Sequence, residues 1–118
     1  MKNVSATVLH AVDTASQTSA QIDSSQTYGA SFQAIFGDTS AAGTLKIQMS
    51  NDLNPNGPES GFTVTNWSDI PLATSTVASG ACPPIILSFI SARYLRVVYT
   101  RSGGGTTTMT VNMFATCV

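Results

Sequence analysis

Histidine, cysteine and carboxylate side chains could carry acid–base, nucleophilic or metal chemistry, and this chain of 118 residues holds few of them. There is one histidine, His10, and there are two cysteines, Cys82 and Cys117. The carboxylates are scattered among predicted turns: Asp13, Asp23, Asp38, Asp52, Glu59 and Asp69. A hydrolytic triad needs three convergent groups, and a glycosidase needs two carboxylates that face each other across a cleft. No spacing brings such a set together, so we expect no catalytic residues, no cofactor and no enzyme activity.

One loop carries oxygen-bearing side chains at the spacing of a calcium site. Asp52, Asn54 and Asn56 stand at alternate positions before a glycine, as in the first half of a calcium-binding loop. The bidentate acid expected at the twelfth position is missing, because Thr63 stands there, and prolines within and after the loop oppose the usual geometry. A turn rich in Asn, Pro and Gly forms without metal. We therefore predict no metal site, with Asp52, Asn54 and Asn56 as weak candidates only.

The two cysteines permit a disulfide without requiring one. Cys82 precedes two prolines in a predicted loop, and Cys117 is the penultimate residue. A bridge between them would tie the C-terminus to that loop, and bridges between molecules are equally open. The start of the chain lacks the continuous apolar run of a secretory signal, which indicates synthesis in a cytoplasm. We favour free thiols, because thiols stay reduced there.

Aromatic side chains are the remaining candidates for a binding site. Trp67, Tyr28, Tyr94 and Tyr99 could form a platform for sugars, because flat apolar rings with polar tips suit carbohydrate faces. Such residues more often fill the core of a β-sandwich. We favour a core position for Trp67, since it ends an alternating segment.

The composition indicates a surface that is suited to contact with other proteins. Charged residues make up 9% of the chain, against about a quarter in typical domains, and Ser and Thr together make up roughly a quarter. Burying ions is costly at an interface, so a surface of hydroxyls is covered at little cost. The net charge of −1 leaves no basic field for nucleic acid. No apolar run approaches the ~18 residues that span a membrane.

Period-two alternation predicts an all-β chain, an antiparallel β-sandwich or jelly roll. Residues 1–118 form one domain, in which residues 1–27 are partly an extended N-terminal arm. The segments that we expect to form strands are 3–12, a short piece around Ile22, 28–36, 44–50, 62–67, 70–77, 85–90, 92–100 and 106–111.

Side-chain patterns within these segments predict what is buried. We expect every second residue of Tyr28–Phe36, starting with Tyr28, to face the core. In the next segment the inward residues are Leu45, Ile47 and Met49. The apolar run Ile85–Ile90 predicts a buried strand. The last two segments, on either side of a glycine run, predict a closing hairpin that is buried between two layers.

The order of three motifs resembles a family of small β-sandwich proteins from tailed bacteriophage virions. The motifs are GTLKIQMSND at residues 43–52, NWSDIP at residues 66–71, and ARYLRVVYT at residues 92–100 before a glycine turn. The chain is also distantly similar to discoidin-type jelly rolls. The match covers roughly residues 20–115, and its motifs are signals of packing and turns, so they specify architecture better than role.

The phage resemblance implies a virion structural protein that is made in the host cytoplasm. Its partners would be other capsid or tail subunits, in a homo-oligomer or in many copies per particle. The role that fits is a capsid decoration or cement subunit, or a head–tail accessory subunit. The discoidin resemblance implies instead a carbohydrate- or receptor-binding module that uses loops at one end, and no ligand residue carries over from it.

Overall fold

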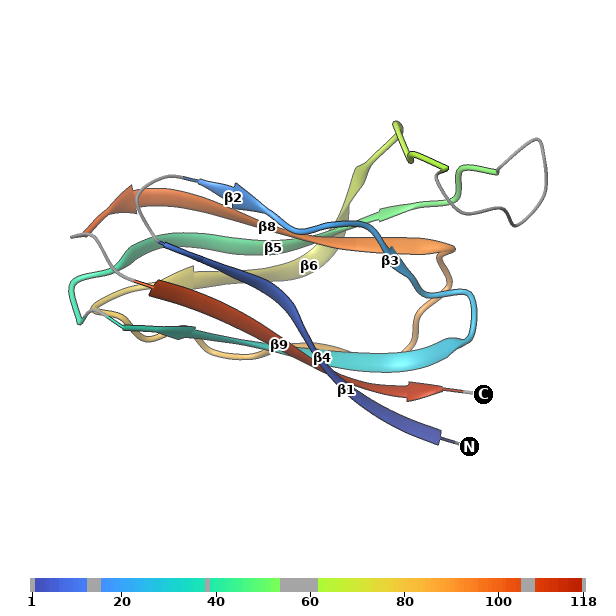
Figure 1. The fold of residues 1–118 in the computed structure, drawn as a ribbon, viewed down its shortest axis with the longest axis horizontal. Coiled ribbons are helices and arrows are strands. Elements are labelled where there is room, and N and C mark those ends of the chain that lie inside the picture. The colour runs from blue at the N-terminus through green and yellow to red at the C-terminus, as the bar shows by residue number, and fades with distance from the viewer. Residues whose placement is uncertain (1, 13–15, 38, 54–61, 105–107, 118) are drawn as a thin grey trace.

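Two antiparallel sheets stack face to face in the computed structural model, which describes residues 2–12, 16–37, 39–53, 62–104 and 108–117 (Figure 1). The four-stranded sheet has, in spatial order, β1 (Lys2–Val12), β9 (Thr108–Cys117), β4 (Thr27–Phe36) and β7 (Ile85–Leu87). The five-stranded sheet has β2 (Gln17–Thr18), β8 (Tyr94–Gly103), β5 (Ala42–Ser50) and β6 (Ser68–Val77), with β3 (Ile22–Asp23) also on β8. The predicted antiparallel β-sandwich is confirmed.

The first 27 residues, for which we expected a partly extended arm, contribute to both sheets. β1 pairs with β9 along its whole length. β2 and β3 both pair with β8, so the described part of the connection between β1 and β4 runs along the edge of the opposite sheet. The short strand expected around Ile22 is β3.

The core is one layer of apolar side chains between the sheets. Alternation places Phe32 of β4, Ile47 of β5 and Val97 of β8 in this layer, each with no exposed surface. The other described apolar residues of the core are Ala30, Ala34, Ala41, Leu45, Ala73, Val77, Ile85, Leu95, Tyr99, Met109, Val111 and Ala115. The inward pattern predicted for 44–50 is confirmed, with Met49 half-buried against this layer.

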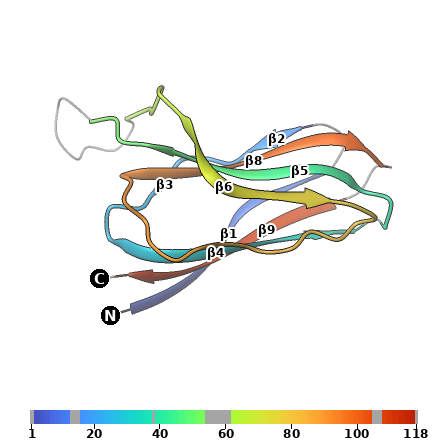
Figure 2. The ribbon, with the colours of Figure 1, turned by 180° about the vertical axis from the view of Figure 1, so that it is seen from behind.

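The predicted closing hairpin is wrong. β8 lies in the five-stranded sheet and β9 in the four-stranded sheet, so the two strands do not pair with each other (Figure 2). Each strand buries one face, and the apolar residues on the other face, such as Val98, are only half-buried. A glycine run signals the end of a strand, and it does not specify which sheet the next strand joins.

Three smaller predictions also fail. Residues 62–67 are not a strand, and β6 begins at Ser68. The run Ile85–Ile90 gives only the three residues of β7, with Ile86 and Phe89 largely exposed. Tyr28, expected inside, is 48% exposed near the start of β4. Tyr28, Ile86 and Phe89 stand at the surface, a choice that hydrophobicity alone does not encode, whereas Val64 is buried without belonging to a strand.

β5 passes close to the ring of Tyr99 in the core. The Tyr99 ring is fully buried, packs at 5.4 Å between ring centroids against Phe36, and donates its hydroxyl to the carbonyl oxygen of Ala42 at 3.1 Å. Gly43 follows, and a Cβ placed there would lie 2.8 Å from Cε1 of Tyr99 and would also overlap the carbonyl oxygen of Thr100. Only glycine lets the backbone pass this close.

We therefore expect Gly43→Ala to destabilise the fold by about 1–3 kcal/mol, because overpacking forces the backbone or the Tyr99 ring to shift. Chemical denaturation followed by tryptophan fluorescence measures this. Gly103→Ala is the matched control, because a Cβ there meets nothing within 4 Å, and its effect should stay within about 0.5 kcal/mol. Equal stability of the two variants would contradict this account of the core.

Candidate interaction surfaces

The outward side of the four-stranded sheet carries no charged side chain over its central rows. The strand registers align Ser5, Phe114, Ser31 and Ile86 across all four strands, and align Thr7, Asn112 and Gln33 in the next row. We call these seven residues the neutral face. Their alternation with buried neighbours such as Phe32 and Ala115 directs them away from the core.

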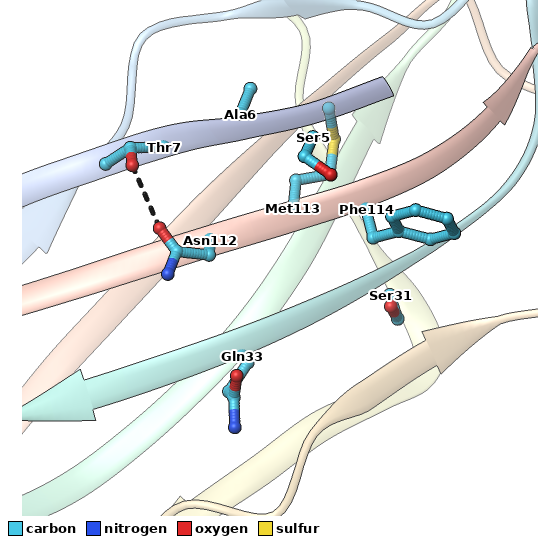
Figure 3. Close-up of a pocket in the computed structure, with 8 residues that line it drawn as sticks. All are labelled: Ser5, Ala6, Thr7, Ser31, Gln33, Asn112, Met113 and Phe114. Atoms are coloured by element: carbon cyan, nitrogen blue, oxygen red, sulfur yellow. Dashed lines mark hydrogen bonds between the residues drawn. The ribbon is translucent and has the colours of Figure 1, made fainter. Parts of the chain in front are cut away.

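An open hollow of about 420 Å³ lies on the neutral face (Figure 3). Thr7 donates its hydroxyl to Oδ1 of Asn112 at 2.9 Å on one side, and the ring of Phe114 stands on the other. A second hollow of about 260 Å³ shares Ser31 and Phe114 and extends to Ile86. The half-exposed Phe114 ring is therefore a ridge between two depressions.

The side chains that line these hollows limit the chemistry that the neutral face can perform. They carry hydroxyls, amides, a thioether and apolar groups, and none of them is ionisable near neutral pH. Such a surface cannot transfer protons or activate a nucleophile. The neutral face can exchange hydrogen bonds with an uncharged surface, and its Phe114 ring can be buried against that surface.

A second cluster lies on the outward side of the five-stranded sheet. Arg96 donates from Nε to Oε1 of Gln48 at 2.7 Å, and Gln48 donates from Nε2 to Oδ1 of Asp69 at 2.8 Å. The Lys46 ammonium lies 3.2 Å from the same Asp69 oxygen. The Gln48 amide and the Lys46 ammonium hold the pKa of Asp69 below its usual value. These polar groups largely satisfy one another.

Trp67 belongs to this second cluster and not to the core, which corrects the position that we favoured. Its ring is half-buried, and the guanidinium of Arg96 lies over it at 4.5 Å from the centroid. The stack is a cation–π contact, in which the Arg96 charge faces the electron-rich ring. A strand prediction for 62–67 could not find this contact, because the residues before β6 are irregular.

Asp52, the first of the three candidate calcium ligands, binds the chain itself. Its Oδ2 accepts the backbone N–H groups of Thr65 and Asn66 at 3.0 and 3.1 Å, and its Oδ1 accepts Nδ2 of Asn66 at 3.0 Å. These hydrogen bonds, led by the one from the Thr65 amide, lower the pKa of Asp52. The carboxylate thus joins the two ends of a loop. Asn54 and Asn56 lie outside the described residues.

The other candidate residues stand apart from one another. His10 shares a 2.8 Å hydrogen bond between Nδ1 and Oγ1 of Thr110 on the exposed side of β1. Cys82 and Cys117 are free thiols, and burial raises the pKa of Cys82. Across the ranges that the structure describes, no three His, Cys, Asp or Glu side chains gather as a metal site would need. The same ranges contain no helix with the length and apolar character to cross a membrane.

Comparison with known proteins shows a likeness in fold. No protein-family model matches the chain, and no curated protein matches it in sequence. The crystal structure of SPBc2 prophage-derived protein YomS is similar in fold, with a TM-score of 0.59 and 9% sequence identity. The similarity covers 97% of this chain and 92% of that one, so the two share the whole architecture.

The Asp52 loop generates a prediction about pH. The pKa of Asp52 in the folded chain lies below the usual value that it has in the unfolded chain, so the folded state binds fewer protons than the unfolded state. The stability that this carboxylate contributes is fully present above that value and is lost as the pH falls through the folded-state pKa. We expect Asp52→Asn to lower stability at pH 7 and to weaken its dependence on pH below about 5.

Thermal unfolding of the wild-type protein and of Asp52→Asn between pH 7 and pH 3 measures this effect. Asn66→Ala is the companion variant, since it removes one donor to Asp52 and keeps the charge, and it should retain part of the pH dependence. Stability curves for wild type and Asp52→Asn that run parallel down to pH 3 would exclude the proposed role of the carboxylate.

Proposed function

We propose that this protein is a non-enzymatic structural protein of a bacteriophage virion, either a capsid decoration or cement subunit or a head–tail accessory subunit. It binds other virion proteins through the neutral face. It is made in the host cytoplasm and carried in the particle. The observation that carries the proposal is the absence of charge on the neutral face, where an exposed aromatic ridge stands between two hollows.

The free energy of covering such a face is favourable for a physical reason. A charged group loses its hydration when an interface closes, and an ion pair across the interface often does no more than offset that loss. The hydroxyls and amides of Ser5, Thr7, Ser31, Gln33 and Asn112 lose less and can hydrogen-bond across the contact. Phe114 adds the buried aromatic anchor that is typical of the centre of a protein interface.

The resemblance of the three motifs to phage sandwich proteins supports the virion assignment. The fold shared with YomS, a protein described as prophage-derived, is compatible with it. A subunit present in many copies gains attachment from repeated contacts, so each single contact can be modest. Within the described residues, the groups with catalytic potential are dispersed, which supports a role in binding over one in catalysis.

The first test uses purified particles of the phage that carries this gene. Mass spectrometry should detect the protein in the particles, and its absence would exclude the role. Particles that lack it should then bind added protein, and Phe114→Asp should weaken that binding about tenfold or more, because it places a charge at the centre of the contact. Thr74→Asp, an exposed change on the opposite sheet, is the control and should bind as wild type does.

A carbohydrate- or receptor-binding module is the second candidate function, and Trp67 is the observation that favours it. Its half-buried ring lies against Arg96, which is hydrogen-bonded to Gln48, and an aromatic ring beside polar groups suits the face of a sugar. Arg96 already covers the ring, so a sugar would have to displace it. We expect no binding signal on a glycan array in the presence of millimolar calcium. A signal that Trp67→Ala abolishes would favour this second function instead.

A further inference from the structure

Three of the four sheet edges are protected against pairing with another strand. At the β6 edge, Pro71 lacks an N–H group and Leu72 has a φ of 65°, which breaks the ladder. The opposite edge of that sheet is formed by β2 and β3, each two residues long. At one edge of the four-stranded sheet, β7 has three residues. These are the usual devices that stop edge-to-edge association.

The fourth edge, β1, lacks this protection over half its length. β1 has eleven residues and no proline, and its register with β9 shifts between Thr7 and Leu9. The shift leaves Lys2–Thr7 as a regular ladder that pairs with β9 on one side only. We call Lys2–Thr7 the open edge. Every second residue of it presents its backbone N–H and C=O away from β9.

The open edge is exposed on both faces as well as along its side. Val4 and Ala6 pair with Ala115 and Met113, so they belong to the inward side of the sheet, yet both are exposed, Val4 by 39%. Figures 1 and 2 show why: this half of β1 runs along the outside of its sheet, away from the five-stranded sheet. An apolar side chain and a row of backbone hydrogen-bonding groups are therefore exposed together.

We propose that the open edge pairs antiparallel with the open edge of a second copy about a two-fold axis, which joins the two four-stranded sheets into one continuous sheet. Backbone hydrogen bonds supply the attraction, as in β-strand addition. A two-fold axis makes the contact self-complementary, because residue i faces residue j and j faces i.

The chemistry of the open edge favours a second copy as the occupant. Lys2 is its only charged residue. In the two-fold antiparallel pair, the two Lys2 side chains lie at opposite ends, so no like charges oppose each other. Alternation keeps inward residues opposite inward residues, which brings Val4 of one copy against Val4 or Ala6 of the other.

The pairing also has a geometric consequence for the neutral face. Ser5 and Phe114 share a register row, so the Phe114 ridges of two copies would lie on the same side of the joined sheet. The contact itself does not depend on the virion function proposed above. A strand edge of six residues is smaller than a standard interface, so we expect a dimer that dissociates on dilution.

Sedimentation velocity from low micromolar to millimolar protein tests the pairing. Wild type should shift from monomer to dimer as concentration rises. Val4→Lys should remain monomeric over the range, because it brings two new charges together at the centre of the pair. Leu72→Lys places the same side chain at a 96% exposed position on the protected β6 edge and should dimerise as wild type does.

Hydrogen exchange supplies an independent measurement on the unmodified protein. The backbone amides of residues 2–7 should exchange more slowly at high concentration, while those of β6 stay unchanged. Ala6→Lys should abolish the dimer as Val4→Lys does, so the test stands even if one variant misfolds. A monomeric wild type, a dimer that survives both substitutions, or protection that never changes with concentration would each overturn the proposal. A monomer that still binds phage particles would leave the proposed function intact.

Discussion

The contact of Tyr99 with β5 is the interaction on which the sandwich depends. A phenol ring at the centre of the core needs a partner for its hydroxyl, and the carbonyl oxygen of Ala42 is that partner. The adjacent Gly43 has no side chain, so the strand can pass the ring at van der Waals distance. Phe36 of β4, which belongs to the other sheet, packs against the same Tyr99 ring. The spacing of the two layers is thus set at this point.

Few charged side chains are available for the exterior of the sandwich, because charged residues make up only 9% of the chain. Three of them meet on one side, where Lys46, Asp69 and Arg96 form a connected cluster with Gln48 and Trp67. The opposite side is left with hydroxyls, amides and the Phe114 ring. The two outward faces therefore differ in kind: one carries charged groups that pair with one another, and the other carries hydroxyls, amides and a half-exposed aromatic ring.

Local alternation predicted the fold class well, because Leu45 and Ile47 point inward wherever the strand is placed. It could not predict which sheet β9 would join, since a crossover and a hairpin have the same turn signal. It also could not find the neutral face, whose Ser5, Ser31 and Phe114 are far apart in sequence and meet only through strand register. Asp52 was identified as a polar loop residue, but its partners Thr65 and Asn66 lie beyond the loop that suggested calcium.

The position of β9 has a consequence for how the chain folds. β9 lies between β1 and β4, so β1 joins the four-stranded sheet only through a strand that is far from it in sequence. β5, β6 and β8 can pair with one another without β9, and β4 can pair with β7, but among the described residues β1 has no strand to pair with until β9 is present. Pairing between chain ends is entropically slow. We therefore expect the ladder between β1 and β9 to form late in folding.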